Sequence, residues 1–410
     1  MYLLYAPPKK FGVLPSKTPI LSDEVLFSGN VAFCPKHYWK KHHVLRGCRD
    51  VSPRWMKRLR RHRTLNKILF VVGGGFGDVM WTMPVMEELR RRHPRANIVI
   101  AATERTMPIF QNVPFANSCV SDVFWNLSSL IHAADEVYDF GGIATILRKE
   151  MKMEPVEACF HHVGIPKPKD KNALRPHLVA THAEGQAAEK VLRENGISPE
   201  KDTIITIGLE ASTPNRNWPF SYVRELSARL RTEGKKVIWL SAKEDFTDMT
   251  ISTCACGNEF VFSSKAPPTA LGWKCPQCGE TTLIEKFLAP EGVVNLAGKT
   301  NIRQAMAIIA LSNVFVGPCS GLMVVATSFR VPTVGLFGAF SPKRIGKHYE
   351  KFSGLWGRSK CAPCNEHWTE CREGYPAPCM KLIGPAQVHS EVKRLLKEHP
   401  RPALSKRPID

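Results

Sequence analysis

Asp78 stands at a position where a carboxylate could act on a ligand. It follows an apolar, β-branched run, Ile68–Val72, and four glycines between positions 73 and 77, and it precedes a helical pattern of apolar residues from Val79 to Leu89. A strand, a glycine loop and a helix form the first half of a βαβ unit. Glycines let the backbone approach a ligand, and a helix N-terminus attracts anions. Asp78 is therefore either a residue of a binding loop or a plain N-cap.

The glycine loop does not fit a dinucleotide-binding fingerprint. Its spacing is G-G-G-x-G-D rather than G-x-G-x-x-G. The acidic residue after the second predicted strand, Glu104, also comes later than the fingerprint requires. A nicotinamide or flavin enzyme is therefore the less favoured interpretation.

Eight of the thirteen cysteines form two clusters with metal-ligand spacing. The first has two knuckles, each followed by a glycine that permits a tight turn, and consists of Cys254, Cys256, Cys275 and Cys278. It predicts a structural zinc ribbon inserted at residues 252–283. A ribbon can bind nucleic acid or protein, and here we expect it to stabilise the insertion. The second cluster predicts a metal site or, alternatively, buried or free thiols, at Cys361, Cys364, Cys371 and Cys379.

The composition describes a globular protein with a strong positive charge. The chain has 410 residues, 43% of them hydrophobic and 23% charged, which is enough for two or three domains. Its net charge of +20 favours a polyanionic partner. Basic residues gather with Trp39 and Trp55 in residues 36–67, which predicts contact with nucleic acid or a membrane surface, or a solvated basic face. Without a membrane-spanning run or a signal-peptide core, we expect a cytoplasmic protein, with peripheral attachment at the inner membrane face as an alternative.

The elements that position these residues alternate between strands and helices. Strand-like runs lie at 68–72, 97–102, 136–140, 203–208, 236–240, 293–296, 314–317 and 333–337, and helix-like runs at 79–89, 156–163, 184–195, 220–232, 301–312, 322–329 and 387–397. This alternation predicts an α/β protein with parallel sheets, in two Rossmann-like domains facing a cleft. The predicted parts are a basic extension (1–66), an N-terminal domain (67–185), a C-terminal domain (186–350) interrupted by the ribbon, a cysteine-rich segment with a closing helix (351–398) and a loose tail (399–410).

Three stretches carry a resemblance to a known family. The first is Gly77-Asp78-Val79 followed by Thr82-Met83-Pro84, and the second is Ala211–Pro219. The third runs from Asn295–Thr300 through Val316–Met323 to Pro332–Pro342. In this order they resemble glycosyltransferase family 9, the heptosyltransferases of lipopolysaccharide synthesis, whose second motif reads Ser/Thr…Lys-x-Trp-Pro.

The resemblance implies a GT-B fold, with the acceptor on the N-terminal domain and a nucleotide-sugar on the C-terminal domain. It implies an inverting reaction without a catalytic metal. Asp78 would take the proton of the acceptor hydroxyl. Arg216, at the family's Lys position, would stabilise the leaving diphosphate. The remaining donor contacts implied are Ser212, Thr213, Glu244, Thr300, Cys319, Ser320, Gly321 and Leu322, with Glu244 on a ribose hydroxyl and the helix after Ser320 on the diphosphate.

The implied partners are a nucleotide-sugar donor, most simply ADP-heptose, and an anionic acceptor, which could be a glycolipid, a protein or a nucleic acid. The tail cysteines are similar to the four-cysteine iron site of the autotransporter heptosyltransferases, so iron and zinc are both expected candidates there. Two residues depart from the family, because Cys319 replaces an Asp and Val324 replaces a His. Both lie at the sugar-reading end, so the resemblance supports the transfer chemistry better than heptose as the sugar.

Two other functions remain open at this point. One is a glycosyltransferase that acts on modified viral DNA, which the basic extension, its tryptophans and the ribbon would suit. The other is a non-catalytic nucleic-acid-binding protein on a degenerate GT-B scaffold, which the two departures would suit.

Overall fold

The computed structural model describes residues 2–5, 26–28, 31–34, 49–50, 66–121, 124–149, 152–241, 250–253, 259–262, 278–279, 283–286, 289–364, 371 and 377–400. Most of the predicted basic extension, most of the predicted ribbon and nearly all of the predicted loose tail lie outside these residues. The chain divides into two compact units. The first comprises Met1–Gly74, Val85–Glu150 and Cys159–Pro166, and the second comprises Gly75–Pro84, Met151–Ala158 and Lys167–Asp410.

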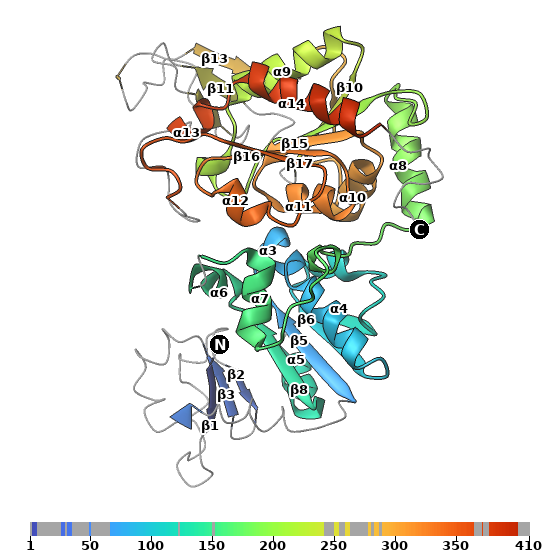
Figure 1. Ribbon diagram of the computed structural model, residues 1–410, viewed down its shortest axis with the longest axis vertical. Helices are drawn as coiled ribbons and strands as arrows, with labels where there is room; N and C mark the ends of the chain where they lie inside the picture. The colour runs from blue at the N-terminus through green and yellow to red at the C-terminus, as the bar shows by residue number, and fades with distance from the viewer. Residues whose placement is uncertain are drawn as a thin grey trace. The chain divides into compact units, whose positions relative to one another are not determined.

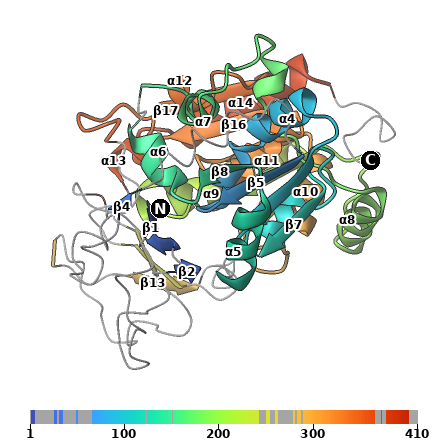
Figure 2. The same ribbon diagram turned by 90° about the horizontal axis from the view of Figure 1, so that it is seen from below.

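The first unit contains a four-stranded parallel sheet in the order β7–β6–β5–β8. Its strands are β5 (Lys67–Val72), β6 (Asn97–Ala102), β7 (Ser118–Ser121) and β8 (Glu136–Phe140). Leu69 and Val71 share a core with Leu127 and Ile131 of α5 (Phe124–Ala133), while the alternate residues of β5 face the opposite way. Figure 2 shows α4 (Met83–Arg92) and α5 on opposite sides of these strands. A sheet covered on both faces explains why its strands are almost continuously apolar.

The helix predicted after the glycine loop is broken in two. The structure has α3 (Phe76–Met80) and α4, separated by Trp81 and Thr82. Pro84 explains the break, because proline has no N–H and its ring clashes with the carbonyl group four residues earlier. It is tolerated in the first turn of α4. Asp78 and α3 belong to the second unit, although β5 belongs to the first.

The second unit contains a six-stranded sheet, parallel throughout, in the order β14–β10–β9–β15–β16–β17. Its strands are β9 (Ile204–Gly208), β10 (Lys236–Leu240), β14 (Val294–Asn295), β15 (Val314–Pro318), β16 (Thr333–Phe337) and β17 (Phe352–Trp356). Its helices include α8 (His182–Glu194), α9 (Phe220–Thr232), α10 (Ile302–Ala310), α11 (Gly321–Ser328), α12 (Pro342–Ile345) and α14 (Pro385–Glu398). Figure 1 shows α9 and α14 on one side of this sheet and α10, α11 and α12 on the other. The two parallel sheets confirm the predicted α/β class.

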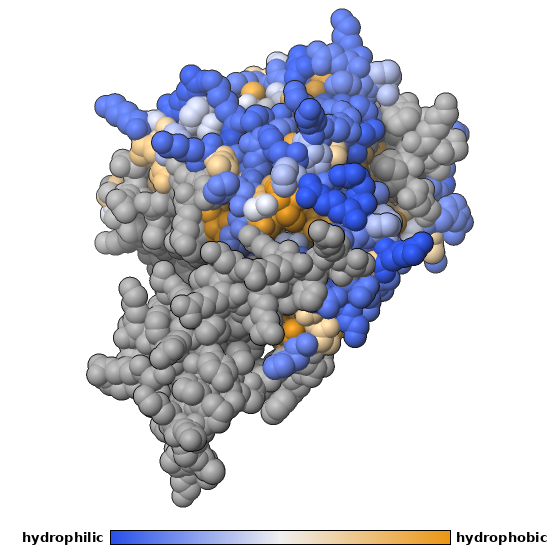
Figure 3. Space-filling model, turned by 60° about the horizontal axis from the view of Figure 1, so that its bottom comes forward, coloured by the Kyte–Doolittle hydropathy of each residue, from blue (hydrophilic) through white to orange (hydrophobic). Residues whose placement is uncertain are grey.

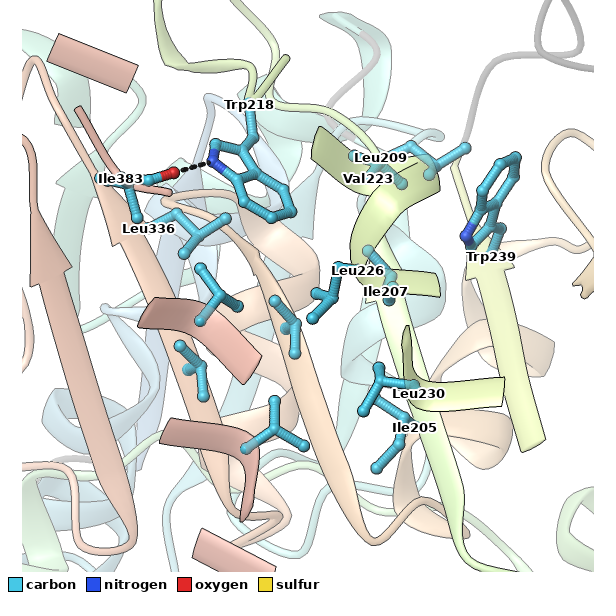
Figure 4. Close-up of a cluster of buried hydrophobic side chains, with 14 of the residues drawn as sticks. Ile205, Ile207, Leu209, Trp218, Val223, Leu226, Leu230, Trp239, Leu336 and Ile383 are labelled. Atoms are coloured by element: carbon cyan, nitrogen blue, oxygen red, sulfur yellow. Dashed lines mark hydrogen bonds between the residues drawn. The ribbon is translucent and has the colours of Figure 1, made fainter. Parts of the chain in front are cut away.

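The core of the second unit joins the sheet to the C-terminal part of the chain. Val223, Leu226 and Leu230, on the predicted apolar face of α9, pack against β9 (Figure 4). Trp218 is buried in the same cluster and donates a hydrogen bond of 2.8 Å from Nε1 to the carbonyl group of Ile383. The segment before α14 is therefore part of this core.

Two smaller sheets complete the described chain. Both are antiparallel: β2–β3–β1–β4, with Tyr2–Tyr5, Leu26–Ser28, Val31–Cys34 and Arg49–Asp50, and β12–β11–β13, with Thr250–Thr253, Glu259–Phe262 and Leu283–Lys286. None of the described helices has both the length and the apolar character that crossing a membrane requires. In the view of Figure 3, hydrophilic residues cover most of the coloured surface, and apolar residues show in smaller patches.

Candidate active site

The order of the six-stranded sheet reverses between β9 and β15. The chain runs from β9 outward to β10 and β14, and then returns to add β15 on the other side of β9. Open α/β sheets bind ligands beyond the carboxyl ends of their strands at such a point, because the two neighbouring loops leave in opposite directions. The loop after β9 contains Ser212–Arg216, and the loop after β15 contains Cys319 and Ser320. The structure thus places these predicted donor residues at the switch point.

Arg216 joins the two loops and is held by all three of its side-chain nitrogens. Nε donates to Oγ1 of Thr213 at 2.8 Å, and Nη2 donates to Oγ of Ser212 at 2.5 Å. Nη1 donates to the carbonyl oxygen of Cys319 at 2.8 Å. The side chain is buried, and the guanidinium carbon lies 5.8 Å from the centre of the Phe340 ring. Because arginine stays protonated in proteins, these contacts fix a positive charge at the switch point.

Asp78 brings a carboxylate near this charge. Its Oδ2 accepts a hydrogen bond of 3.1 Å from the backbone N–H of Gly75, the N-cap residue of α3. The interpretation of Asp78 as a plain N-cap is therefore wrong, since Asp78 lies in the first turn of the helix. Burial raises the pKa of Asp78, and the Gly75 bond and the charge of Arg216 oppose that rise. A carboxylate with a raised pKa is a better proton acceptor than one exposed to water.

The N-terminus of α11 adds a third feature to the same place. Ser320 precedes the helix in an extended conformation, and its side chain makes no capping hydrogen bond. In the described part of the chain, its buried Oγ has no hydrogen-bond partner. The first N–H groups of a helix have no partner within the helix and attract anions. This terminus can therefore accept a phosphate group.

Gly321 allows α3 and α11 to approach closely. A Cβ atom on Gly321 would lie 2.8 Å from the Cβ of Phe76, which is too close for a side chain. From the other helix, a Cβ on Gly77 would lie 3.7 Å from the side chain of Val324. Two glycines and a valine thus bring the helix that carries Asp78 against the helix that follows Ser320. Val324, where the family has His, is used for this packing.

Cys319 supplies a backbone contact rather than a charged side chain. The residue is buried, and its carbonyl group accepts the bond from Arg216. Burial raises the pKa of the thiol to about 11, although the charge of Arg216 lowers it. The side chain is therefore neutral near pH 7, where the family's Asp would be charged.

The other predicted donor residues are not all joined to this group. Thr300 follows β14, in a loop whose Gly298 donates to the carbonyl group of Ser241 at the end of β10. Leu322 lies in the first turn of α11. Within the described residues, no hydrogen bond connects Thr300 or Leu322 to Arg216 or Asp78. Glu244, predicted to bind a ribose, lies outside the described residues.

Sequence reasoning missed three residues that shape the site. Phe340 lies next to the Arg216 guanidinium, and Arg344 of α12 is near enough to Cys319 to lower its pKa. The side chain of Asn217 accepts a hydrogen bond of 2.8 Å from the N–H of Ala211 and so holds the loop after β9. The available signal was position, because Phe340 comes three residues after the predicted strand 333–337 and Arg344 comes seven residues after it.

The structure describes five of the eight predicted metal ligands. Cys254, Cys256 and Cys275 of the predicted ribbon lie outside the described residues, and Cys278 is exposed. In the tail, Cys361 and Cys364 are exposed, Cys371 is half-buried and Cys379 is buried. Burial, together with the charges of Cys371, Cys361 and Cys364, raises the pKa of Cys379 to about 11. No group of three or more metal-ligating side chains is arranged around a common point in the described part of the chain. Both metal sites therefore stay predictions.

A family model matches part of the second unit. Residues 279–374 match the model described as Glycosyltransferase family 9 (heptosyltransferase). This range includes β14, α10, β15, α11, β16, α12 and β17, and hence the loop with Cys319 and Ser320. The match supports the family resemblance for this half of the candidate site.

Curated relatives of the chain are heptosyltransferases. Lipooligosaccharide heptosyltransferase 2 of Haemophilus influenzae is 27% identical over 190 residues, which are 46% of this chain and 46% of that protein. Lipopolysaccharide heptosyltransferase 2 of Salmonella typhimurium is 22% identical over 323 residues, which are 67% of this chain and 84% of that protein. The first alignment thus spans about half the length of that relative.

Solved structures with the same fold are also transferases. The glycosyl transferase family 9 protein of Veillonella parvula has a TM-score of 0.58 at 15% identity, over 81% of this chain and 97% of that chain. ADP-heptose lps heptosyltransferase II of E. coli has a TM-score of 0.56 at 21% identity, over 82% and 100%. The iron-containing dodecameric glycosyltransferase TibC of enterotoxigenic E. coli has a TM-score of 0.54 at 14% identity, over 82% and 77%, and its complex with ADP-D-beta-D-heptose scores 0.51 at 13% identity, over 82% and 76%. These likenesses show the predicted GT-B fold, and with the sequence matches they support a glycosyltransferase enzyme.

Proposed function

We propose that this protein is an inverting glycosyltransferase, which moves a sugar from a nucleoside-diphosphate donor to a hydroxyl group of an anionic acceptor. One observation carries the proposal: Arg216, the uncapped N-terminus of α11 and the carboxylate of Asp78 meet at the switch point of the six-stranded sheet. ADP-heptose is the simplest donor, because the relatives are heptosyltransferases and TibC binds ADP-D-beta-D-heptose.

The three features divide the chemistry between them. Asp78 takes the proton of the acceptor hydroxyl as its oxygen attacks the anomeric carbon. The bond between that carbon and the diphosphate breaks on the opposite side, so the configuration inverts. Negative charge develops on the leaving diphosphate, where Arg216 and the N–H groups of α11 stabilise it. Ser212 and Thr213 orient Arg216 for this task, because they accept two of its hydrogen bonds.

Thermal stabilisation by nucleotide sugars tests the donor site. ADP-heptose, other ADP, UDP and GDP sugars and the three nucleotides alone should be compared, because a ligand present at 100 times its Kd stabilises the folded state by about 2.7 kcal/mol. Arg216→Met should abolish the effect of the correct donor. Arg229→Met is the matched control, since Arg229 is exposed and pairs with Glu225 on α9. If no nucleotide stabilises the protein, the proposal fails.

The acceptor is proposed from charge and from the names of the relatives. A net charge of +20 suits an anionic acceptor, and a lipopolysaccharide-type glycolipid fits the relatives. Sugar transfer should be assayed in parallel on such a glycolipid and on hydroxymethylated duplex DNA, since the chain could use either. If sugar were transferred to the DNA and not to the glycolipid, the acceptor would be DNA. Binding of DNA without transfer from any donor would favour a non-catalytic scaffold.

We also propose a structural metal ion at the four tail cysteines and a zinc ion in the ribbon. The tail residues fit by their chemistry, because four cysteine thiols are a common ligand set for zinc and iron and a bound cation deprotonates the thiols that coordinate it. Metal analysis of the purified protein should find two ions per chain and identify the tail metal as iron or zinc. Cys379→Ser should remove one ion, and Cys159→Ser, at a buried thiol of α7 (Pro155–Val163), should remove none.

A further inference from the structure

β17 is the last strand of the six-stranded sheet on its side. It pairs in parallel with β16, and no other described strand pairs with it. All five of its residues are half-buried, so each of them still reaches the surface in part. The strand at the other end of the sheet, β14, has only two residues. Short edges are a common protection against unwanted pairing, and β17 lacks it.

Hydrogen bonds at the two ends of β17 fix which backbone groups face outward. The N–H of Thr333 donates to the carbonyl group of Lys351 at 2.9 Å, and the N–H of Gly357 donates to the carbonyl group of Phe337 at 2.9 Å. In a parallel ladder the N–H and C=O of one residue point to the same side, and successive residues alternate. Residues 351, 353, 355 and 357 therefore face β16. Phe352, Gly354 and Trp356 present their N–H and C=O groups to the open side.

A groove of about 400 Å³ follows this open side. Its lining consists of Pro342, Lys343, Phe352, Gly354, Leu355, Trp356, Arg358 and Gln387. The three outward-facing residues of β17 are all among them. A Cβ on Gly354 would lie 2.5 Å from the Cβ of Pro342, so this glycine is needed for α12 to pack so closely. With α12 on one side and Gln387 of α14 on the other, the edge forms the floor of a channel.

The charges around the channel have one sign. Lys343 and Arg358 are exposed, and the lining contains no acidic residue. The Arg358 guanidinium lies 5.1 Å from the centre of the Trp356 ring, which places its charge at the end of the strand. A second copy of this chain paired through β17 would bring two such cationic pairs together, and like charges oppose association. The channel therefore favours an acidic occupant.

We propose that an extended acidic segment of a partner protein binds along β17 and adds a seventh strand to the sheet. Main-chain hydrogen bonds to Phe352, Gly354 and Trp356 would supply the affinity, and Lys343 and Arg358 would select acidic side chains. The binding surface does not include Arg216, Asp78 or the N-terminus of α11. It is therefore independent of the proposed transfer reaction.

Hydrogen exchange with a model peptide tests the proposal on the full-length protein. The probe is a blocked five-residue peptide of alternating glutamate and valine. It should slow exchange of the amides of Phe352, Gly354 and Trp356 by about tenfold or more at saturation. The same peptide with every residue N-methylated, which removes its main-chain donors, should give no protection. Equal binding of the methylated peptide would overturn strand addition, and so would protection absent from these three amides.

Charge reversal tests the selection of acidic segments. The double variant Lys343→Glu/Arg358→Glu should weaken binding of the acidic peptide by about tenfold or more and should bind a lysine–valine peptide instead. Lys190→Glu, at an exposed position of α8, is the matched control and should bind like the wild type. Binding of the lysine–valine peptide by the double variant would show that this variant is folded. The proposal of an acidic partner would be refuted if neither peptide bound the double variant. It would also be refuted if sedimentation showed that the wild-type protein self-associates and that this association protects β17 from exchange.

Discussion

The N-termini of α3 and α11 differ in how their N–H groups are satisfied. At α3, the protein supplies its own anion, because the carboxylate of Asp78 accepts the N–H of Gly75. At α11, Ser320 makes no capping bond. Arg216 donates a hydrogen bond to the carbonyl group of Cys319, the residue before Ser320, and so places a positive charge close to this helix terminus. Both helices follow a strand and a glycine-containing or serine-containing turn. The N-terminus of α11 can therefore accept an external anion, whereas that of α3 already holds a carboxylate.

The comparison also separates two roles that the sequence leaves merged. A glycine loop before a helix is typical of phosphate binding, so the loop before α3 resembles a phosphate site. The structure fills that helix terminus with Asp78, whose pKa burial raises and Arg216 lowers. The carboxylate is thus held by α3 while it remains in the field of the cation. This arrangement suits a base next to a leaving group.

Asp78→Asn is the change with the largest expected effect. Asparagine retains an oxygen that can accept the Gly75 N–H, so α3 should stay capped, but it cannot take a proton at neutral pH. We expect turnover to fall by about 10²–10⁴-fold with little change in donor affinity. Single-turnover transfer and nucleotide titration measure the two quantities. Retention of turnover within tenfold would show that the carboxylate only holds the N–H of Gly75 and takes no proton in the reaction.

Much of the fold was predictable, because short continuous apolar runs indicate buried strands and apolar residues spaced by three or four positions indicate helices. The strands 97–102, 136–140, 236–240 and 333–337 and the helix 220–232 are confirmed with the predicted limits. β17 was missed because its five residues include a central glycine and are covered only in part. The break between α3 and α4 was missed because the apolar pattern continues across Pro84.

The members of the candidate site could be proposed from the sequence, but their contacts could not. Arg216 and Cys319 stand 103 residues apart, and the reversal of strand order that brings them together is a property of the whole sheet. The sequence gives no sign that Cys319 acts through its carbonyl group. The contact of Phe340 with Arg216 was likewise not predictable, because it depends on the turn after β16.

Ser320→Asp tests the other helix terminus by giving it the anion that α3 already has. An aspartate at the N-cap should accept N–H groups of α11 and interact with the helix dipole, which stabilises the fold by about 0.5–2 kcal/mol. The same carboxylate should repel the diphosphate and compete for Arg216. We therefore expect a higher Tm together with at least about tenfold weaker binding of the nucleotide, measured by calorimetry.

Ser320→Ala is the control for this variant. Because the serine hydroxyl makes no capping bond, its loss should change stability by less than about 0.5 kcal/mol. The N-terminus of α11 would be established as an anion site by two results together. Ser320→Asp should raise stability and weaken nucleotide binding, and Ser320→Ala should leave stability almost unchanged. Unchanged nucleotide affinity in Ser320→Asp would place the diphosphate elsewhere.

A third helix extends the comparison, because α7 also begins at a carboxylate. Oε2 of Glu154 accepts the N–H groups of Val156 at 2.9 Å and Glu157 at 3.1 Å. The side chain is buried, and His348 lies 3.7 Å from Oε2. Burial raises the pKa of Glu154 to about 8, whereas the two backbone bonds and Arg344 oppose that rise and the charge of Glu157 adds to it. Here a helix terminus holds an acid that is largely protonated at neutral pH.

Glu154→Gln should have the smallest effect, and only at high pH. A carboxyl group whose pKa is raised on folding keeps full stability below its unfolded value of 4.5 and loses it as pH rises through about 8. Glutamine keeps the oxygen that caps α7 but cannot ionise. The variant should therefore match the wild type near pH 4 and exceed it at pH 9 by at least about 1 kcal/mol, or a Tm rise of roughly 2–4 °C. Thermal unfolding across this range measures the difference. If the variant were more stable than the wild type by the same amount at both pH values, ionisation of Glu154 would not be the cause of the added stability. In that case α7 would tolerate a buried carboxylate at its N-terminus, as α3 does.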